Sequence, residues 1–173
     1  MRIAVTGASG QISSQVVRLL AGEQTHRVIA LSRRVLPSGR WPAGVSARAA
    51  DYADLEALGT ALRGVDTLVF VSSDGPVAQV MVHHCNVIRA ARASGLAHIV
   101  ALSGLDADPC SPFCYAVSYG YTELLLAESG CLVSTDAWSP AGRTGGCWFG
   151  TRPVPAPDQS SWAATTAGGR QWR

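Results

Sequence analysis

The chain alternates short, continuously apolar runs with longer segments in which apolar residues recur at helical spacing. The short runs are rich in Val, Ile, Leu and Ala and do not alternate with polar residues, a pattern typical of strands buried on both faces of a parallel sheet. This pattern predicts strands over residues 3–5, 26–31, 45–50, 67–71 and 97–102. It predicts helices over residues 12–20, 55–62, 77–93 and 118–128, the second capped by Asp54 and the last two ended by Gly95 and Gly130. The order of these elements predicts an α/β fold: a parallel sheet with helices on both faces.

The pattern stops near Gly130. From residue 131 to 173 the only Val, Leu, Ile or Met residues are Leu132, Val133 and Val154, and no apolar periodicity survives past Val133. We therefore expect an ordered domain over residues 1–130, followed by an irregular, disordered segment over residues 131–173. On this interpretation the sheet is incomplete at its C-terminal end.

The amino-acid composition excludes several kinds of structure and function for this chain. Of the 173 residues, 47% are hydrophobic and 15% are charged, which excludes a wholly disordered chain. The formal net charge of +2 does not indicate a nucleic-acid partner. All 14 basic residues are Arg, so chemistry that needs a Lys is excluded.

Compartment is predicted from the same composition. No apolar run approaches the roughly 20 residues of a membrane-spanning helix, and the apolar part of the first segment ends in a turn after a few residues, unlike a signal peptide. We expect a cytoplasmic protein without a membrane partner, in which the five cysteines are free thiols.

The turn after the first strand carries the pattern Gly7-x-x-Gly10-x-x-Ser13. Two glycines allow a tight turn and a close approach of the backbone to a pyrophosphate, and the following helix directs its N–H groups at the phosphates. Ser13 replaces the third glycine of the usual pattern. We expect this segment to bind a dinucleotide through Gly7, Ser9, Gly10, Gln11 and Ile12; the alternative is a plain structural turn.

The ends of the second and third strands bear on the choice of cofactor. The second strand ends in Ser32-Arg33-Arg34, without the Asp or Glu that holds the ribose hydroxyls of NAD. Arg33 could accept a 2′-phosphate, which favours NADP(H) over NAD(H), or it could be a solvated arginine. Asp51 could accept a hydrogen bond from the adenine amino group, or it could be a capping or loop residue.

Two further loops follow strands that should end at the same edge of the sheet. Ser72, Ser73 and Gly75 follow the fourth strand, where we expect the nicotinamide end of a dinucleotide, and Ser103 ends the fifth strand in the same crevice. The consecutive His83, His84 and Cys85 lie about 100° apart on a helix, so we expect no metal site there.

Taken together, these motifs resemble the NmrA-like group of atypical short-chain dehydrogenases, and among them most closely the type-2 NAD(P)H:quinone oxidoreductases. The resemblance runs from Arg2 to about Gly130 and rests on residues 6–11, 50–52, 71–73, 84–88 and 128–130. It implies a Rossmann-like domain that binds NADP(H), and hydride transfer to a small quinone-like acceptor.

Two departures qualify what the resemblance implies. The group often has a His at the position of Tyr119, so Tyr119 is only a weak candidate for a catalytic residue. The family continues after Gly130 with a sixth strand and a substrate region, whereas residues 131–173 resemble the product of a shifted reading frame; the alternative is a divergent natural tail. A truncated domain could lack activity, with an exposed strand edge that favours self-association. An NADP-sensing regulator without catalysis, or a fragment with neither function, are the competing hypotheses.

Overall fold

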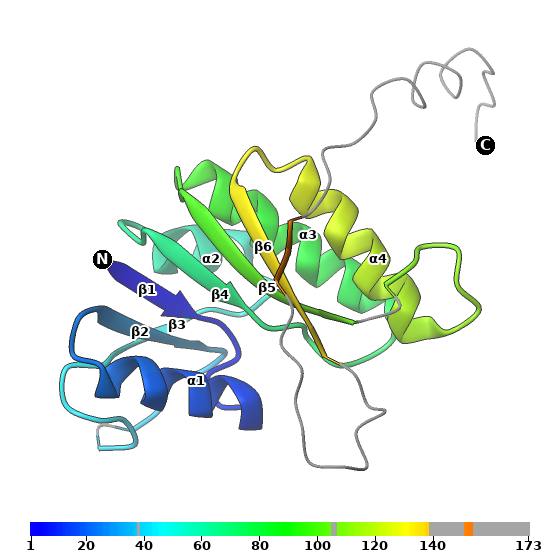
Figure 1. Cartoon of the computed structure of the whole chain (residues 1–173). Coiled ribbons are helices and arrows are strands. Elements are labelled where there is room, and N and C mark those ends of the chain that lie inside the picture. The colour runs from blue at the N-terminus through cyan, green and yellow to red at the C-terminus, as the bar shows by residue number, and fades with distance from the viewer. Residues whose placement is uncertain (38, 105–106, 139–150, 154–173) are drawn as a thin grey trace.

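The computed structural model describes residues 1–37, 39–104, 107–138 and 151–153 (Figure 1). Its helices are α1 (Gln11–Gly22), α2 (Leu55–Ala61), α3 (Val77–Ala93) and α4 (Cys114–Ala127). Its strands are β1 (Arg2–Val5), β2 (Arg27–Ser32), β3 (Ser46–Ala49), β4 (Thr67–Phe70), β5 (His98–Gly104), β6 (Leu132–Trp138) and β7 (Thr151–Pro153). None of the helices in this described part is long and apolar enough to span a membrane.

The strands form one sheet in the order β3-β2-β1-β4-β5-β6-β7. Every pairing from β3 through to β6 is parallel, and β7 pairs antiparallel with β6. The chain reverses the direction in which it adds strands between β3 and β4, on either side of β1. This is the Rossmann-like arrangement, in which ligands lie outside the carboxyl ends of the strands at the reversal. The predicted α/β fold is confirmed.

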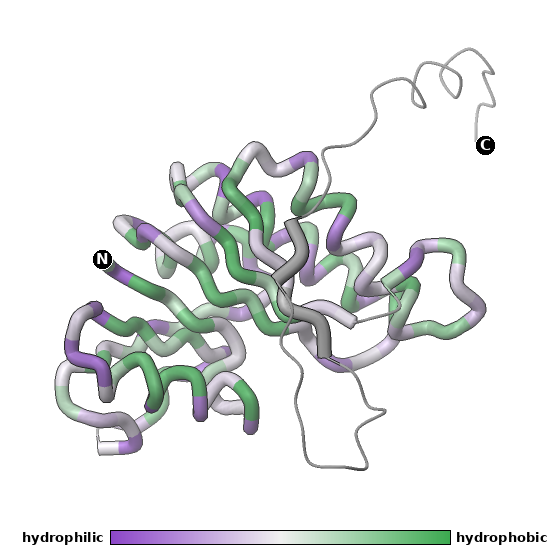
Figure 2. Tube along the Cα trace, in the orientation of Figure 1, coloured by the Kyte–Doolittle hydropathy of each residue, from purple (hydrophilic) through white to green (hydrophobic). Residues whose placement is uncertain are grey.

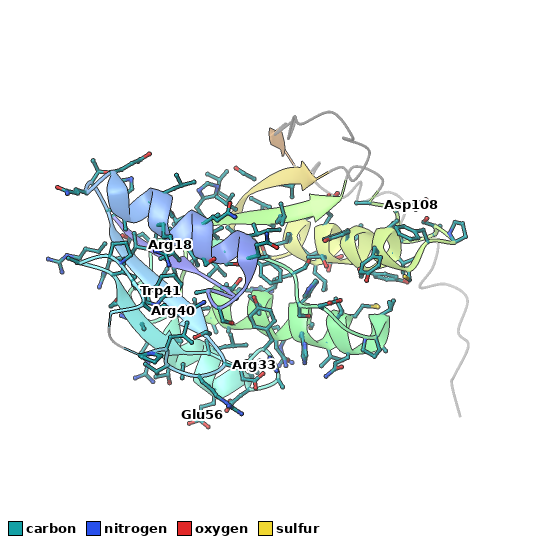
Figure 3. The ribbon with its side chains drawn as sticks, turned by 90° about the horizontal axis from the view of Figure 1, so that it is seen from below. Arg18, Arg33, Arg40, Trp41, Glu56 and Asp108 are labelled. Carbon is teal, nitrogen blue, oxygen red and sulfur yellow. The ribbon has the colours of Figure 1, made fainter. Side chains whose placement is uncertain are left out.

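Alternate residues of β1 and β2 point to opposite faces of the sheet and belong to two separate hydrophobic cores. Val5, Val28 and Ala30 pack against α1 on one face, whereas Ile29 and Leu31 join the larger core under α2, α3 and α4. Figures 1 and 3 show α1 on one side of the sheet and α2 and α3 on the other. Hydrophobic residues run along the central strands (Figure 2), because helices cover both faces there, and the predicted placement of helices on both faces is confirmed.

The cover is less complete over β5. Its residues alternate between buried and half-buried, whereas every residue of β2 after Arg27 is buried. Ile99 and Ala101 join the larger core and Ser103 bonds Glu123 of α4, whereas the alternate residues Val100 and Leu102 are only half-buried. The sequence of β5 therefore reads as a strand buried on both faces although its structure is not.

Strand β6 corrects the boundary expected at residue 130. Leu132–Trp138 pairs along its whole length with β5, from His98 and Leu132 at one end to Gly104 and Trp138 at the other. The expectation of an irregular segment beginning at residue 131 is wrong for residues 132–138. Val133 packs against the larger core and Thr135 is 2% exposed, so pairing with a formed strand and burial of these two alternate side chains are enough to order a segment with little apolar periodicity. The rest of the expected irregular segment, apart from β7, lies outside the described residues.

Helix α4 begins earlier than the sequence predicts. It starts at Cys114 rather than near Ser118, and its N-cap, Phe113, provides no side-chain hydrogen bond. The sequence signal for a start was therefore missing. The other helices match their predictions closely: Asp54 accepts a hydrogen bond from the N–H of Ala57 at 2.9 Å, as its predicted capping role requires.

Candidate functional site

The turn between β1 and α1 is built by its two glycines. Gly7 has φ +60°, a conformation that other residues adopt only with strain, and the N–H of Gly10 donates to the carbonyl of Gly7 at 2.8 Å. A Cβ on Gly10 would come within 3.1 Å of that carbonyl oxygen. Ser13, the residue in place of the third glycine, is 2% exposed and so fits beneath the turn.

The amino end of α1 opens at this turn. The first intrahelical hydrogen bond runs from the N–H of Ser14 to the carbonyl of Gly10. Gly10, the N-cap residue, has no side chain that could accept from the N–H groups of residues 11–13. The amides of Gln11 and Ile12 therefore have no partner within the helix, and they lie at the positive end of its dipole. This end of α1 is suited to an anion such as a pyrophosphate.

Three hollows join along the carboxyl edge of the sheet. The middle one, of about 270 Å³, is lined by residues that include Gly7, Gly10, Tyr52 and His83. A second, of about 440 Å³, shares Ser9, Ser32, Arg33 and Asp51 with it, and a third, of about 350 Å³, shares Ser72, Ser73 and Asp74. Because neighbouring hollows share lining residues, they lie next to one another beside the amino end of α1, and we call the three together the carboxyl-edge groove.

The β2 end of the groove is basic. Arg33 and Arg34 are exposed, and both line the 440 Å³ hollow. No hydrogen bond or ion pair joins the Arg33 guanidinium to another of the residues that the structure describes. Arg40 is occupied elsewhere: its guanidinium and that of Arg18 lie over the ring of Trp41, 5.6 and 6.0 Å from its centroid, beside α1 (Figure 3). Arg33 and Arg34 are therefore the arginines available to a ligand in this hollow.

Asp51 lies on the opposite wall. Its carboxylate accepts a hydrogen bond from the N–H of Ala53 at 3.0 Å, and it lines both the middle and the basic hollow. The carboxylate thus closes a turn of its own loop and still faces the groove, so the two sequence-based alternatives for Asp51 are compatible. The helix cap itself is Asp54.

Tyr52 forms the buried floor of the middle hollow. Its hydroxyl donates to the carbonyl of Val71 at 2.8 Å, and its own carbonyl accepts from the side-chain amide of Asn86 at 3.0 Å. Burial raises the pKa of Tyr52 well above its usual value, although a hydrogen bond with Thr6 acts in the opposite direction. This phenol therefore stays protonated and connects β4 to the loop after β3.

The third hollow lies between α1, the loop after β4 and the first turns of α4. Ile12, Gly75, Leu102 and Tyr119 are among its lining residues, and Ile12 is 48% exposed. An apolar wall with a few hydroxyl groups suits a planar organic molecule. Tyr119 also packs on β5, where a Cβ on Gly104 would meet its ring at 3.0 Å.

Two of the residues predicted for the site are not in the groove walls. Ser103 is 4% exposed, and its hydroxyl donates to the Glu123 carboxylate at 2.6 Å instead of facing a hollow. Gln11 is exposed at the amino end of α1 but lines none of the three hollows. The other predicted residues all line the groove: Gly7, Ser9, Gly10, Ile12, Arg33, Asp51, Ser72, Ser73, Gly75 and Tyr119.

The sequence reasoning missed Tyr52 and His83, although both line the middle hollow. The sequence pattern raises His83 only as a possible metal ligand. Among the residues that the structure describes, no three of His, Cys, Asp or Glu gather into a metal site. The signal that could have found both residues is their place: Tyr52 follows Asp51 directly, and His83 lies on the helix that leaves the Ser72–Gly75 loop.

Residues 7–123 match a family model described as NAD(P)H-binding. The chain belongs to this family. The matched segment begins at the glycine turn and ends in α4, so it includes every wall of the carboxyl-edge groove.

Relatives support the same family. Quinone oxidoreductase 2 of Escherichia coli (strain K12) is 39% identical over 130 residues, which are 74% of this chain and 45% of that protein. A crystal structure of an NADPH-dependent quinone oxidoreductase from Escherichia coli, complexed with NADPH, is 36% identical with a TM-score of 0.66, over 79% of this chain and 49% of the other. The triphenylmethane reductase of Citrobacter sp., complexed with NADP(H), is 29% identical with a TM-score of 0.71, over 80% and 50%.

These comparisons confirm the resemblance to NmrA-like reductases of the quinone-oxidoreductase type, and they confirm an NAD(P)H-binding chain with a Rossmann-like fold. The chain spans about half the length of the relatives it matches.

Proposed function

We propose that the carboxyl-edge groove binds NADPH in preference to NADH and that the bound cofactor reduces a quinone-like acceptor. The observation that carries this proposal is the row of three adjoining hollows beside the amino end of α1. A dinucleotide is long and has its two phosphates in the middle, and the groove has an anion-binding helix end in its middle hollow.

The basic hollow would hold the adenosine end. Arg33 and Arg34 are exposed there, and among the described residues that line this hollow they outnumber the one acidic residue, Asp51. A guanidinium on a phosphate makes charge-assisted hydrogen bonds. Asp51, which lines this hollow, would accept a hydrogen bond from the adenine amino group, and the pyrophosphate would lie against Gly7, Gly10 and the free amides of α1.

The hollow lined by Ile12, Leu102 and Tyr119 would hold the nicotinamide and the acceptor. The bound nicotinamide supplies the hydride; the chain supplies an apolar wall that excludes water and a phenol, Tyr119, that could give a proton to the acceptor oxygen. Reduction of a quinone to the hydroquinone needs one hydride and one proton, so NADPH and a proton donor complete it. Among the relatives, quinone reduction is named for the Escherichia coli proteins.

Titration of both cofactors tests the binding half of the proposal. The wild-type chain should bind NADPH more tightly than NADH. Arg33→Ala should weaken NADPH about tenfold to a hundredfold, as expected for a charge-assisted contact of roughly 1.5–3 kcal/mol, and should leave NADH nearly unchanged. The matched control is Arg40→Ala, which removes a guanidinium that stacks on Trp41 away from the groove. Equal losses for the two cofactors would contradict a 2′-phosphate site at Arg33.

Steady-state turnover tests the second half of the proposal, the reduction of a quinone-like acceptor. Oxidation of NADPH in the presence of a simple benzoquinone, followed at the absorbance of the reduced nicotinamide, should depend on the protein and should fall in Tyr119→Phe. NADPH binding without any turnover would instead favour a cofactor-sensing protein.

A further inference from the structure

Two consecutive histidines of α3, His83 and His84, form hydrogen bonds with Ser73. Its backbone N–H donates to Nε2 of His84 at 3.2 Å, and its hydroxyl lies 3.3 Å from Nδ1 of His83. His84 is fully buried, whereas His83 is half-buried and lines the middle hollow. The loop after β4 is thus fixed from the interior by one ring and from the groove side by the other.

The hydrogen bonds of His84 define its tautomer. A backbone N–H can only donate, so Nε2 is the unprotonated nitrogen and Nδ1 carries the hydrogen. Nδ1 then donates to the hydroxyl of Thr122 at 2.6 Å, and that hydroxyl donates to the carbonyl of Ser118 at 2.6 Å. One chain of hydrogen bonds therefore runs from the loop after β4, through α3, to the backbone of α4.

The surroundings of His84 keep this arrangement in one state. The imidazole packs edge-on against Phe70, with ring centroids 5.0 Å apart. Burial, together with the charge of His83 beside it, lowers the pKa of His84 to about 4. The ring is therefore neutral at physiological pH, which leaves Nε2 free to accept the N–H of Ser73.

The position of this loop sets the geometry of the groove, since Ser72, Ser73 and Asp74 line both the middle hollow and the third hollow. A shift of Ser73 would move the shared wall and change the distance between the pyrophosphate and nicotinamide positions. Because the N–H of Ser73 is given to His84, it is also not available to a ligand.

We propose that His84 is a positioning residue for the dinucleotide: by accepting the Ser73 N–H and bonding Thr122, it fixes the wall between the two ligand hollows relative to α4. This inference rests on the proposed cofactor site. It predicts that a substitution at His84, which is buried outside the groove, weakens the binding of NADPH and NADH by the same factor.

Two amide substitutions separate the two hydrogen bonds of the ring. The side-chain amide of Gln reaches about as far as Nε2 and can still accept from Ser73, whereas that of Asn reaches only as far as Nδ1 and can bond Thr122 but not Ser73. We expect His84→Asn to weaken NADPH and NADH about tenfold each, and His84→Gln to stay within about threefold of the wild type. The free energy of unfolding, measured in urea at pH 7.5, should fall in both variants.

A purely structural role for His84 would lower stability in both variants and leave the affinity of the folded protein equal to that of the wild type; that result would overturn the inference. The two proposals fail in different ways. If the wild type binds neither cofactor, the proposed function fails; if it binds NADPH and His84→Asn binds equally well, only the role of His84 fails.

If His84→Asn does not fold, Thr122→Val carries the test. It keeps the shape of the side chain and removes the partner of Nδ1. Like His84→Gln, it keeps the bond to Ser73 and loses the bond to Thr122, so we expect it to weaken both cofactors by an equal factor of about two to three. Unchanged affinities would overturn the inference. His98→Gln is the matched control, because His98 lies at the start of β5, where its Nε2 contacts the Ser134 hydroxyl at 3.0 Å, and it lines none of the three hollows. Both affinities should stay unchanged in this variant.

Discussion

The same substitution, Gly→Ala, should have opposite effects in two helices of this chain. Gly120 lies in the interior of α4, where the loop before the helix crosses it: an added Cβ would lie 2.6 Å from the carbonyl carbon of Asp108 and closer still to the nitrogen of Pro109. Comfortable carbon contacts need about 3.5–4.0 Å, so the loop or the helix would have to move by about 1 Å. The obstacle is backbone, which cannot rotate away as a side chain can.

The cost can be bounded. Overpacking of this kind costs about 1–3 kcal/mol, and the clash with backbone atoms places Gly120→Ala at the upper end of that range. The better helix propensity of Ala returns about 1 kcal/mol, so we expect a net loss of about 1–2 kcal/mol in the free energy of unfolding. Gly59, within α2, has no atom within 4 Å of its Cβ position. Gly59→Ala should therefore stabilise the protein by about 0.4–1 kcal/mol.

Urea denaturation of the two variants and the wild type, followed by far-ultraviolet circular dichroism, measures both effects with one method. The decisive quantity is the difference between the variants, about 2 kcal/mol, because it is insensitive to errors common to all three extrapolations. Gly120→Ala as stable as Gly59→Ala would show that the loop does not approach α4 closely, and would refute the packing argument. In Gly120→Ala, a shift of α4 should also weaken binding of the acceptor, because Tyr119 of α4 lines the third hollow.

Three further predictions concern the turn, the buried histidine and the sheet edge. Gly10→Val should abolish NAD(P)H binding in a folded protein, because a branched side chain would fill the space beside the Gly7 carbonyl where phosphates would lie; unchanged affinity in a titration would contradict this. Because of His84, the free energy of unfolding should fall by up to about 3 kcal/mol as the pH is lowered from 6.5 to 4. The pKa of His84 is about 4 in the folded protein and higher in the unfolded chain, so the unfolded chain binds the extra proton in this range. The same pH series on His84→Gln should lack this contribution. A chain ended at Gly130 should be less stable than the full chain and should associate at lower concentration in size-exclusion chromatography, because the loss of β6 leaves β5 as an open edge.

The sequence predicted the sheet and the first half of the site because these depend on local signals. Apolar runs and glycine positions define β1, α1 and the turn at Gly7 and Gly10, and these signals act over a few residues. Strand β6 was not predicted because its order comes from pairing with β5 and not from its own pattern. For the same reason, the sequence predicts Ser103 in the crevice although its hydroxyl bonds Glu123. The end of a strand can be predicted, but the partner of this side chain is a residue of α4 that comes 20 positions later in the chain.

Close packing was the least predictable feature. Gly120 reads as an unfavourable residue inside a helix, and only the path of the loop across α4 shows why a side chain does not fit there. Tyr52 and His84 were likewise invisible as site residues, because their roles depend on contacts with Val71 and Ser73 on a different part of the chain.

The interior place of β1 has a consequence for the order in which this chain can fold. Ile3 pairs with Val28 on one side and with Thr67 on the other, so β1 is synthesised before both of its neighbours and has one unpaired side until β4 has been made. The β1–β2 pair with α1 can form early from nearby residues, whereas the β1–β4 pairing closes a loop of more than 60 residues. During synthesis, the glycine turn is therefore made long before the wall that faces it across the groove, and a nascent chain that has reached α2 presents an apolar strand edge to its surroundings.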